Sequence, residues 1–173
     1  MKGRVRVEVE KCTACKRCML ACATEKSGTT DVLEAMMQKN PARPRVRLVT
    51  IEGTAVPTEC HHCDAPACLA ACPAGAIIKG GPGMPVLLLQ ERCIGCRSCM
   101  VACPYGVIQL DERDLTPYKC DLCVTRLANG QVPACVEACP TGCLSFEQEQ
   151  QVEGWLRSIK QAVAPDPVEV QGG

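Results

Sequence analysis

The chain has very few aromatic side chains for its length. Its 173 residues include one Trp, one Phe and two Tyr. Aromatic residues normally dominate the burial energy of a core, so a purely hydrophobic core of ordinary composition is not expected. The shortage also argues against nucleic-acid binding, which uses aromatic rings for stacking and an excess of positive charge. Here 19 basic residues balance 19 acidic ones, and no nucleic-acid partner is predicted.

Long apolar runs and a secretory leader are also missing. The longest apolar runs, such as Cys18 to Ala23, fall far short of the roughly 20 residues that span a bilayer. Residues 1–12 form a charged, alternating segment without an apolar h-region. We therefore expect no direct membrane span and a cytoplasmic location, although a partner with its own signal could carry the chain across a membrane. In the reducing cytoplasm, dense cysteines indicate metal rather than disulfides.

Cysteine is abundant, with 17 residues, and 16 of them fall into four quartets. The quartets are Cys12, Cys15, Cys18, Cys22; Cys60, Cys63, Cys68, Cys72; Cys93, Cys96, Cys99, Cys103; and Cys120, Cys123, Cys135, Cys139. The third quartet has the C-x2-C-x2-C-x3-C-P spacing of bacterial ferredoxins, in which the fourth cysteine serves a second cluster. The sequence therefore predicts sixteen thiolate ligands for the iron of four 4Fe–4S clusters.

Three quartets end in Cys-Pro-x-Gly, with prolines at Pro73, Pro104 and Pro140. Proline ends the ligand turn, and glycine permits a reversal into the next strand. Zinc is the main alternative, because Cys-x-x-Cys pairs also build four-cysteine zinc sites. Zinc sites use two separated pairs, whereas the first and third quartets contain evenly spaced triplets. This spacing favours iron–sulfur clusters over zinc, with disulfides third.

Regular structure is expected to be short and to follow the cysteine groups. A helix should begin near Met19, another should include Met36 and Met37, and an amphipathic helix with Trp155 as its anchor should span residues 150–163 before an extended tail. Strands are expected at residues 5–9, 46–51, 76–78, 86–89, 107–110 and 144–146.

Several residues fall outside the quartets. Cys143 is expected to be a small buried residue rather than a ligand, since free cysteine is often buried. His61 and His62 are interpreted as ordinary loop residues, with cluster tuning or proton transfer as the alternative. Tyr105 should pack beside a cluster. Residues 1–50 hold 11 basic against 5 acidic residues, an excess that either offsets cluster charge, docks an acidic partner or is simply solvated.

The chain resembles the four-cluster, ferredoxin-like electron-transfer subunits of molybdenum and tungsten oxidoreductases, such as formate dehydrogenase, dimethyl sulfoxide reductase and aldehyde oxidoreductase. It is equally similar to the iron–sulfur subunits of hydrogenases and carbon monoxide dehydrogenase. The resemblance covers roughly Val5 to Phe146. Besides the quartets, it rests on the Cys-His-His-Cys-Asp-Ala-Pro-Ala-Cys segment from Cys60 and the Lys-Cys-Asp-Leu-Cys segment from Lys119.

The resemblance implies an α+β fold of two bacterial-ferredoxin-like modules, one inserted in the other. Residues 1–51 and 113–149 would form the outer module, residues 52–112 the inner module, and residues 150–173 the C-terminal helix and tail. The implied ligand sets are Cys12, Cys15, Cys18 with Cys139; Cys120, Cys123, Cys135 with Cys22; Cys60, Cys63, Cys68 with Cys103; and Cys93, Cys96, Cys99 with Cys72.

No substrate machinery is visible in the sequence, neither a Gly-x-Gly-x-x-Gly nucleotide loop nor a nucleophile with a base. The chain is therefore expected to be no enzyme by itself but an electron relay between a catalytic oxidoreductase subunit and a ferredoxin or flavoprotein. A self-associating scaffold built through the C-terminal helix and a zinc-binding interaction module are the alternatives.

Overall fold

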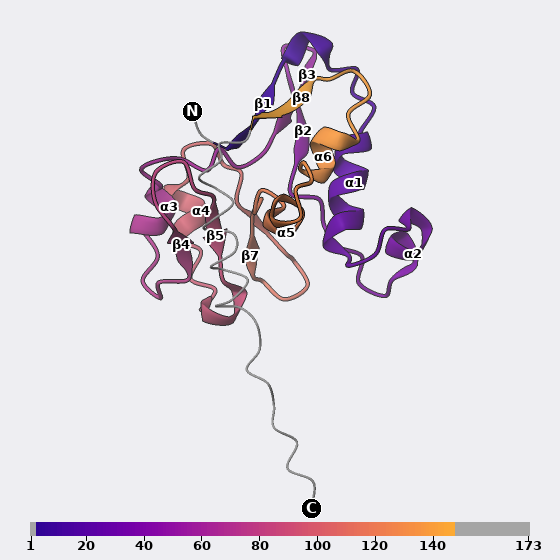
Figure 1. Cartoon of the computed structure of the whole chain (residues 1–173). Helices are drawn as coiled ribbons and strands as arrows, with labels where there is room; N and C mark the ends of the chain where they lie inside the picture. The colour runs from indigo at the N-terminus through magenta and orange to yellow at the C-terminus, as the bar shows by residue number, and fades with distance from the viewer. Residues whose placement is uncertain (1–2, 148–173) are drawn as a thin grey trace, which may run out of the picture.

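The structure, a computed structural model, describes residues 3–147 as short helices and short strand pairs joined by long loops, an α+β arrangement (Figure 1). The helical elements are η1 (Val9–Lys11), α1 (Arg17–Lys26), α2 (Val32–Met37), α3 (Ala67–Ala70), η2 (Gln90–Arg92), α4 (Ser98–Ala102), α5 (Val124–Ala128) and α6 (Ala134–Glu137). The strands are β1 (Arg4–Val7), β2 (Arg47–Ile51), β3 (Thr54–Thr58), β4 (Ile77–Lys79), β5 (Val86–Leu88), β6 (Gln109–Leu110), β7 (Pro117–Tyr118) and β8 (Leu144–Glu147).

Within residues 3–147 the strands form four antiparallel pairs, β1–β8, β2–β3, β4–β5 and β6–β7. The β1–β8 pair joins the two ends of the described chain, with Val5 opposite Phe146 and Val7 opposite Leu144. Figure 1 shows the indigo β1 beside the orange β8. Because β1 precedes the first cysteine group and β8 follows the last, their pairing makes these two groups neighbours in space.

The sequence patterns predict strand β2 of the β2–β3 hairpin but do not predict β3. β3 contains Pro57, which lies opposite Leu48, and proline within an apolar run usually argues against a strand. The turn explains the pairing. Glu52 and Gly53 have φ values of +49° and +80°, which is the conformation of the two-residue turns favoured in hairpins.

The strands predicted from the sequence are all present, although β1 ends at Val7 because Val9 lies in η1. The helix expected from Met19 begins at Arg17. Met36 and Met37 are helical as predicted, and they are 63% and 85% exposed. α2 stands at the margin of the molecule (Figure 1). The amphipathic helix predicted for residues 150–163, with Trp155, and the tail lie outside the described residues.

Two apolar cores are present, and each combines two cysteine groups. The first core contains Val5, Cys18, Cys22, Val46, Leu122, Leu127, Cys135, Cys143 and Leu144, from the segments around the first and fourth groups. The second contains Ile77, Val86, Cys99 and Ile108, with Cys68, Cys72 and Cys103 packed against them, from the segments around the second and third groups. Cysteines thus supply much of the buried surface that the missing aromatic residues would otherwise provide.

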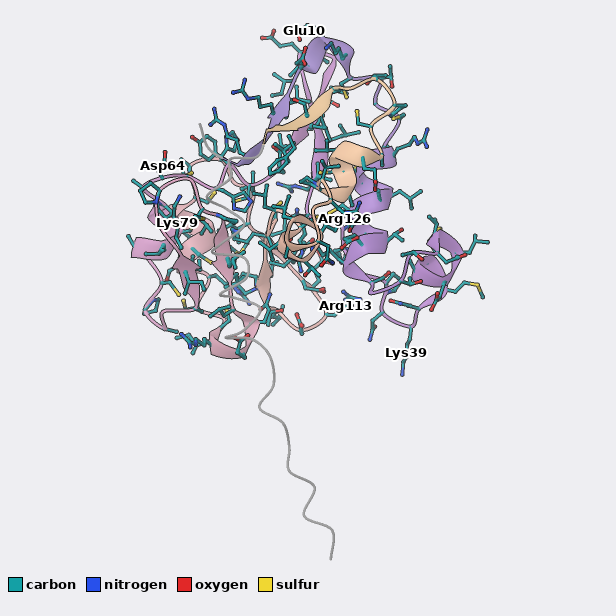
Figure 2. The ribbon with its side chains drawn as sticks, in the orientation of Figure 1. Glu10, Lys39, Asp64, Lys79, Arg113 and Arg126 are labelled. Carbon is teal, nitrogen blue, oxygen red and sulfur yellow. The ribbon has the colours of Figure 1, made fainter. Side chains whose placement is uncertain are left out.

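Arg126 of α5 forms ion pairs with both α1 and α6 beside the first core. Its guanidinium contacts Glu25 of α1 at 3.3 Å and Glu137 of α6 at 2.6 Å, and its Nε donates to the backbone carbonyl of Val132 at 2.8 Å. The planar guanidinium can make these contacts together, which a lysine ammonium at the same place could not match in geometry. Figure 2 shows Arg126 at the centre of the molecule, between α1 and α6.

Candidate metal centres

Three hollows in the described residues are each lined by four quartet cysteines from two different groups, and the third also by Cys143. The cysteines are Cys60, Cys63, Cys68 and Cys103 in the first hollow; Cys93, Cys96, Cys99 and Cys72 in the second; and Cys12, Cys15, Cys18 and Cys139 in the third. In every case three cysteines belong to one group and the fourth comes from another. These groupings are those that the family resemblance implies, whereas the spacing alone left the partner of each triplet open.

The remaining four cysteines are Cys22, which belongs to α1, and Cys120, Cys123 and Cys135 of the fourth group. Burial raises the pKa of the Cys135 thiol, and the thiols of Cys22 and Cys123 add to the shift. Burial likewise raises the pKa of Cys120, and Cys135 contributes to that shift as well. Cys22 and Cys135 belong to the same core, so the structure brings Cys22 to a cysteine of the fourth group that is about a hundred residues away in sequence.

The size of the hollows bears on what the cysteines could hold. Their empty volumes, with adjoining open space included, are about 340, 290 and 300 Å³. A single zinc ion needs its sulfur ligands about 2.3 Å from one point. Within residues 3–147, no three His, Cys, Asp or Glu side chains are arranged to hold one metal ion. The thiols instead surround a space, and this arrangement fits a multi-atom iron–sulfur cluster.

The first Cys-x-x-Cys turn of every group has the same unusual backbone conformation. The residue before the second cysteine of the group has positive φ in all four groups: +56° at Ala14, +47° at His62, +69° at Gly95 and +60° at Leu122. Left-handed backbone at a residue other than glycine costs about 1–2 kcal/mol, so its recurrence at Ala14, His62 and Leu122 indicates a geometric requirement. Successive N–H groups in such a turn form a concave surface that favours negative charge, as an iron–sulfur cluster carries.

Backbone N–H groups also point at individual sulfur atoms. The N–H of Arg45 donates to Cys22 Sγ at 3.2 Å, that of Ala76 to Cys72 Sγ at 3.3 Å, and that of Leu122 to Cys120 Sγ at 3.3 Å. Hydrogen bonds to cluster sulfurs are one of the means by which a protein sets reduction potential. Two of the three acceptors, Cys22 and Cys72, are the last cysteines of their groups, so these bonds orient sulfurs that turn away from their own triplet.

Cys143 is buried as predicted, with 2% of its surface exposed. It lines the same hollow as Cys12, Cys15, Cys18 and Cys139. Burial raises the pKa of its thiol to about 12, with further contributions from Cys12. The burial of Cys143 in the first core agrees with its prediction as a packing residue.

Both histidines lie in the loop of the second group, as interpreted from the sequence. His62 is nevertheless buried, with 6% exposed, and its Nδ1 accepts a hydrogen bond from the backbone N–H of Val86 at 3.0 Å. Burial lowers its pKa well below the usual range. His61 stacks on Tyr105, which lines the first hollow as expected for a residue beside a cluster.

Charged residues that the sequence patterns did not single out surround the centres. The carboxylate of Asp121 pairs with Lys26 at 2.8 Å and with Arg45 at 2.9 Å, all three from different segments. Lys79 donates to the backbone carbonyl of Cys63 at 2.6 Å and pairs with Asp64 at 3.7 Å, on the left side of Figure 2. These cations are half-buried or buried, so they place positive charge close to the thiols.

Loops of this kind, each presenting three cysteines to one site and a fourth to the next, define an iron–sulfur protein of the bacterial-ferredoxin type. Residues 51–149 match the family described as the 4Fe-4S dicluster domain, and residues 9–25 match the 4Fe-4S binding domain. The first match covers more than half of the chain, and the chain belongs to the 4Fe-4S dicluster family. Its cofactors are 4Fe–4S clusters, and its function is electron transfer.

Curated relatives carry related names. An iron–sulfur protein of Rhodospirillum rubrum is 38% identical over 144 residues, covering 76% of this chain and 75% of that protein. The B subunit of the anaerobic dimethyl sulfoxide reductase of Haemophilus influenzae is 39% identical, covering 79% of this chain and 69% of that protein. The iron–sulfur subunit of nitrate-inducible formate dehydrogenase of Escherichia coli is 36% identical over 91% of this chain, which spans 57% of that subunit. In the described part of the chain, no helix is both long and apolar enough to cross a membrane.

Proposed function

We propose that the chain is the four-cluster electron-transfer subunit of an oxidoreductase complex, relaying single electrons between a catalytic subunit and a second redox protein. The observation that carries this proposal is the meeting of cysteines from two distant loops around each hollow. When bound, a 4Fe–4S cluster accepts and donates one electron at a time. The chain's own contribution is to hold the clusters in one connected series.

The proposed ligands are the sixteen quartet cysteines in the four sets implied by the family resemblance. Two ferredoxin-like modules would hold them, the inner one within residues 52–112 and inserted between the halves of the outer one. Supporting this division, the first core draws on the segments around the first and fourth groups, and the second core on those around the second and third. The β1–β8 pair closes the outer module across the insertion.

The exposure of the cysteines supports an order for the series. Among the 17 cysteines, all within the described residues, Cys15 and Cys96 are the exposed ones. They belong to different modules and to the third and second hollows. Electron transfer between proteins needs a cofactor near the surface, so we propose that the clusters at Cys15 and Cys96 are the two ends of the relay. The clusters at Cys120 and at Cys68 would then be the middle pair.

The partner at one end is proposed to be a molybdenum- or tungsten-containing catalytic subunit. The names of the relatives support this proposal, since one is a subunit of formate dehydrogenase and another a subunit of dimethyl sulfoxide reductase. The other end would meet a ferredoxin, a flavoprotein or a further redox subunit.

Metal and sulfide analysis of anaerobically purified protein tests the cofactor count. We expect about sixteen iron and about sixteen sulfide per chain, with a broad visible absorbance that bleaches on reduction. Stoichiometric zinc without sulfide would defeat the proposal and support the zinc-binding module.

Co-purification from native cells under anaerobic conditions tests the partner. The expected result is a discrete complex with a second subunit that contains molybdenum or tungsten. A complex with a hydrogenase or a carbon monoxide dehydrogenase would retain the relay function and change the partner. A particle that grows with protein concentration and contains this chain alone would favour the scaffold.

A further inference from the structure

The ammonium of Lys119 lies between Val86 of β5 and Cys120. We call the region between these two residues the seam. Lys119 is 3% exposed. Its Nζ donates one hydrogen bond to the backbone carbonyl of Val86 and another, at 2.7 Å, to that of Cys120. Val86 belongs to the second core and lines the first hollow. A single buried cation therefore touches both halves of the molecule.

The charge of Lys119 is not neutralised by the groups to which it donates, because both are uncharged carbonyls. The carboxylate of Asp121, next in sequence to Cys120, is already engaged by Lys26 and Arg45. On the other side of the seam, Val86 donates its N–H to Nδ1 of the buried His62, so that nitrogen is a hydrogen-bond acceptor and supplies no negative charge. A buried cation is costly unless negative charge compensates it.

A cluster site lies on each side of this cation. Lys119 donates to the carbonyl of Cys120, which belongs to the fourth set, and to that of Val86, which lines the first hollow together with Cys68. The same charge therefore lies beside two different cluster sites, and it favours the form of each that carries more negative charge.

Reduction adds one negative charge to a cluster, and burial disfavours that charge. We propose that Lys119 sets the reduction potentials of two clusters, the one at Cys68 and the one at Cys120. Its positive charge keeps both reduction potentials more positive than burial alone would make them. In the transfer, one electron leaves one cluster and enters the other, so no further reactant is needed. The inference rests on the proposed function, because it needs clusters at both sets.

The test is an anaerobic redox titration, followed by electron paramagnetic resonance, of the complete chain with its clusters. Lys119→Met and Lys119→Gln remove the charge, and Gln retains a donor for the carbonyls. Lys119→Arg keeps the charge. Lys39→Met is the matched control, since it removes one positive charge from an exposed lysine that points into solvent at the lower right of Figure 2.

We expect both neutral variants to shift two of the four midpoint potentials to more negative values and to leave the other two in place. Lys119→Arg and Lys39→Met should retain the wild-type values. Unchanged potentials in a neutral variant with its full iron and sulfide would overturn the inference, as would an equal shift of all four. Missing iron in the wild-type protein would instead count against the proposed function.

If neither neutral variant retains its iron, the order in which the clusters of the wild-type protein are reduced tests the inference. Burial alone would make the two seam clusters the last to be reduced, whereas the proposed effect of Lys119 requires at least one of them to be reduced before an end cluster. Cys15→Ser and Cys96→Ser mark the signals of the end clusters. A first or second signal unaffected by either substitution supports the inference. If the first two signals both respond to these substitutions, the inference fails.

Discussion

The imidazole of His61 stacks on the phenol ring of Tyr105, with the ring centroids 3.9 Å apart and the planes at 10° to each other. His61 lies between the first two cysteines of the second group, and Tyr105 follows the Cys103-Pro104 end of the third group. Both rings line the first hollow. The stack therefore joins the two loops that we propose to share a cluster, and it covers that cluster on the solvent side, since Tyr105 is 52% exposed.

Removing the stack should make the cluster behind it more sensitive to oxygen. An aromatic pair contributes about 0.5–1.5 kcal/mol beyond its buried area, so Tyr105→Ala should accelerate the loss of one cluster in air about fivefold. Tyr105→Phe keeps the ring and should bleach at the wild-type rate. Visible absorbance during exposure to air measures both. Equal bleaching of the Ala and wild-type proteins would show that the stack does not protect the cluster.

Cys143 and Cys139 should behave differently although they line the same hollow. Cys143→Ala should keep about sixteen iron per chain and lower the melting temperature by about 2–4 °C, through the loss of about 1 kcal/mol of core packing. Cys139→Ala should lose iron from one cluster, because we propose Cys139 as a ligand. Iron analysis and thermal denaturation under anaerobic conditions provide the comparison. Loss of iron in Cys143→Ala would place Cys143 among the ligands.

Gly95 and Ala14 occupy the same position in two Cys-x-x-Cys turns, with φ of +69° and +56°. Gly95→Ala should destabilise the protein by about 1 kcal/mol, and Ala14→Gly should stabilise it by a similar amount, since the left-handed conformation is strained for alanine and relaxed for glycine. A Cβ at Gly95 would meet no protein atom within 4 Å. The expected changes in melting temperature are opposite in sign and about 2–4 °C each. Shifts of the same sign would contradict this explanation.

Removal of iron should unfold most of the chain. Thiols and small apolar residues make up much of both cores, and metal binding supplies the folding free energy of small metal-dependent domains. Treatment with an iron chelator under reducing, anaerobic conditions should therefore abolish most far-ultraviolet circular dichroism. Reconstitution with iron and sulfide should restore it. An apoprotein that keeps its circular dichroism and a cooperative thermal transition would show that the polypeptide folds without its clusters.

Local features of this protein were predictable because they depend on neighbours in sequence. The triplet spacing of Cys93, Cys96 and Cys99 indicates a ligand loop without any reference to the rest of the chain. The β4–β5 hairpin and the helix containing Met36 follow from local periodicity and turn residues. β3 is not predicted because Pro57 interrupts its apolar pattern, and the exposure of Met37 depends on what lies beside α2.

The sequence by itself determined the kind of protein: sixteen cysteines in four groups, a scarcity of aromatic residues and short alternating segments define an iron–sulfur protein. Which distant segments meet was decided by the tertiary structure alone, as Cys72 beside Cys93, Cys139 beside Cys12, and Lys119 against Val86 show. Residue spacing controls geometry within a loop. The meeting of separate loops depends on how strand pairs and cores close around them, and that is a property of the whole chain.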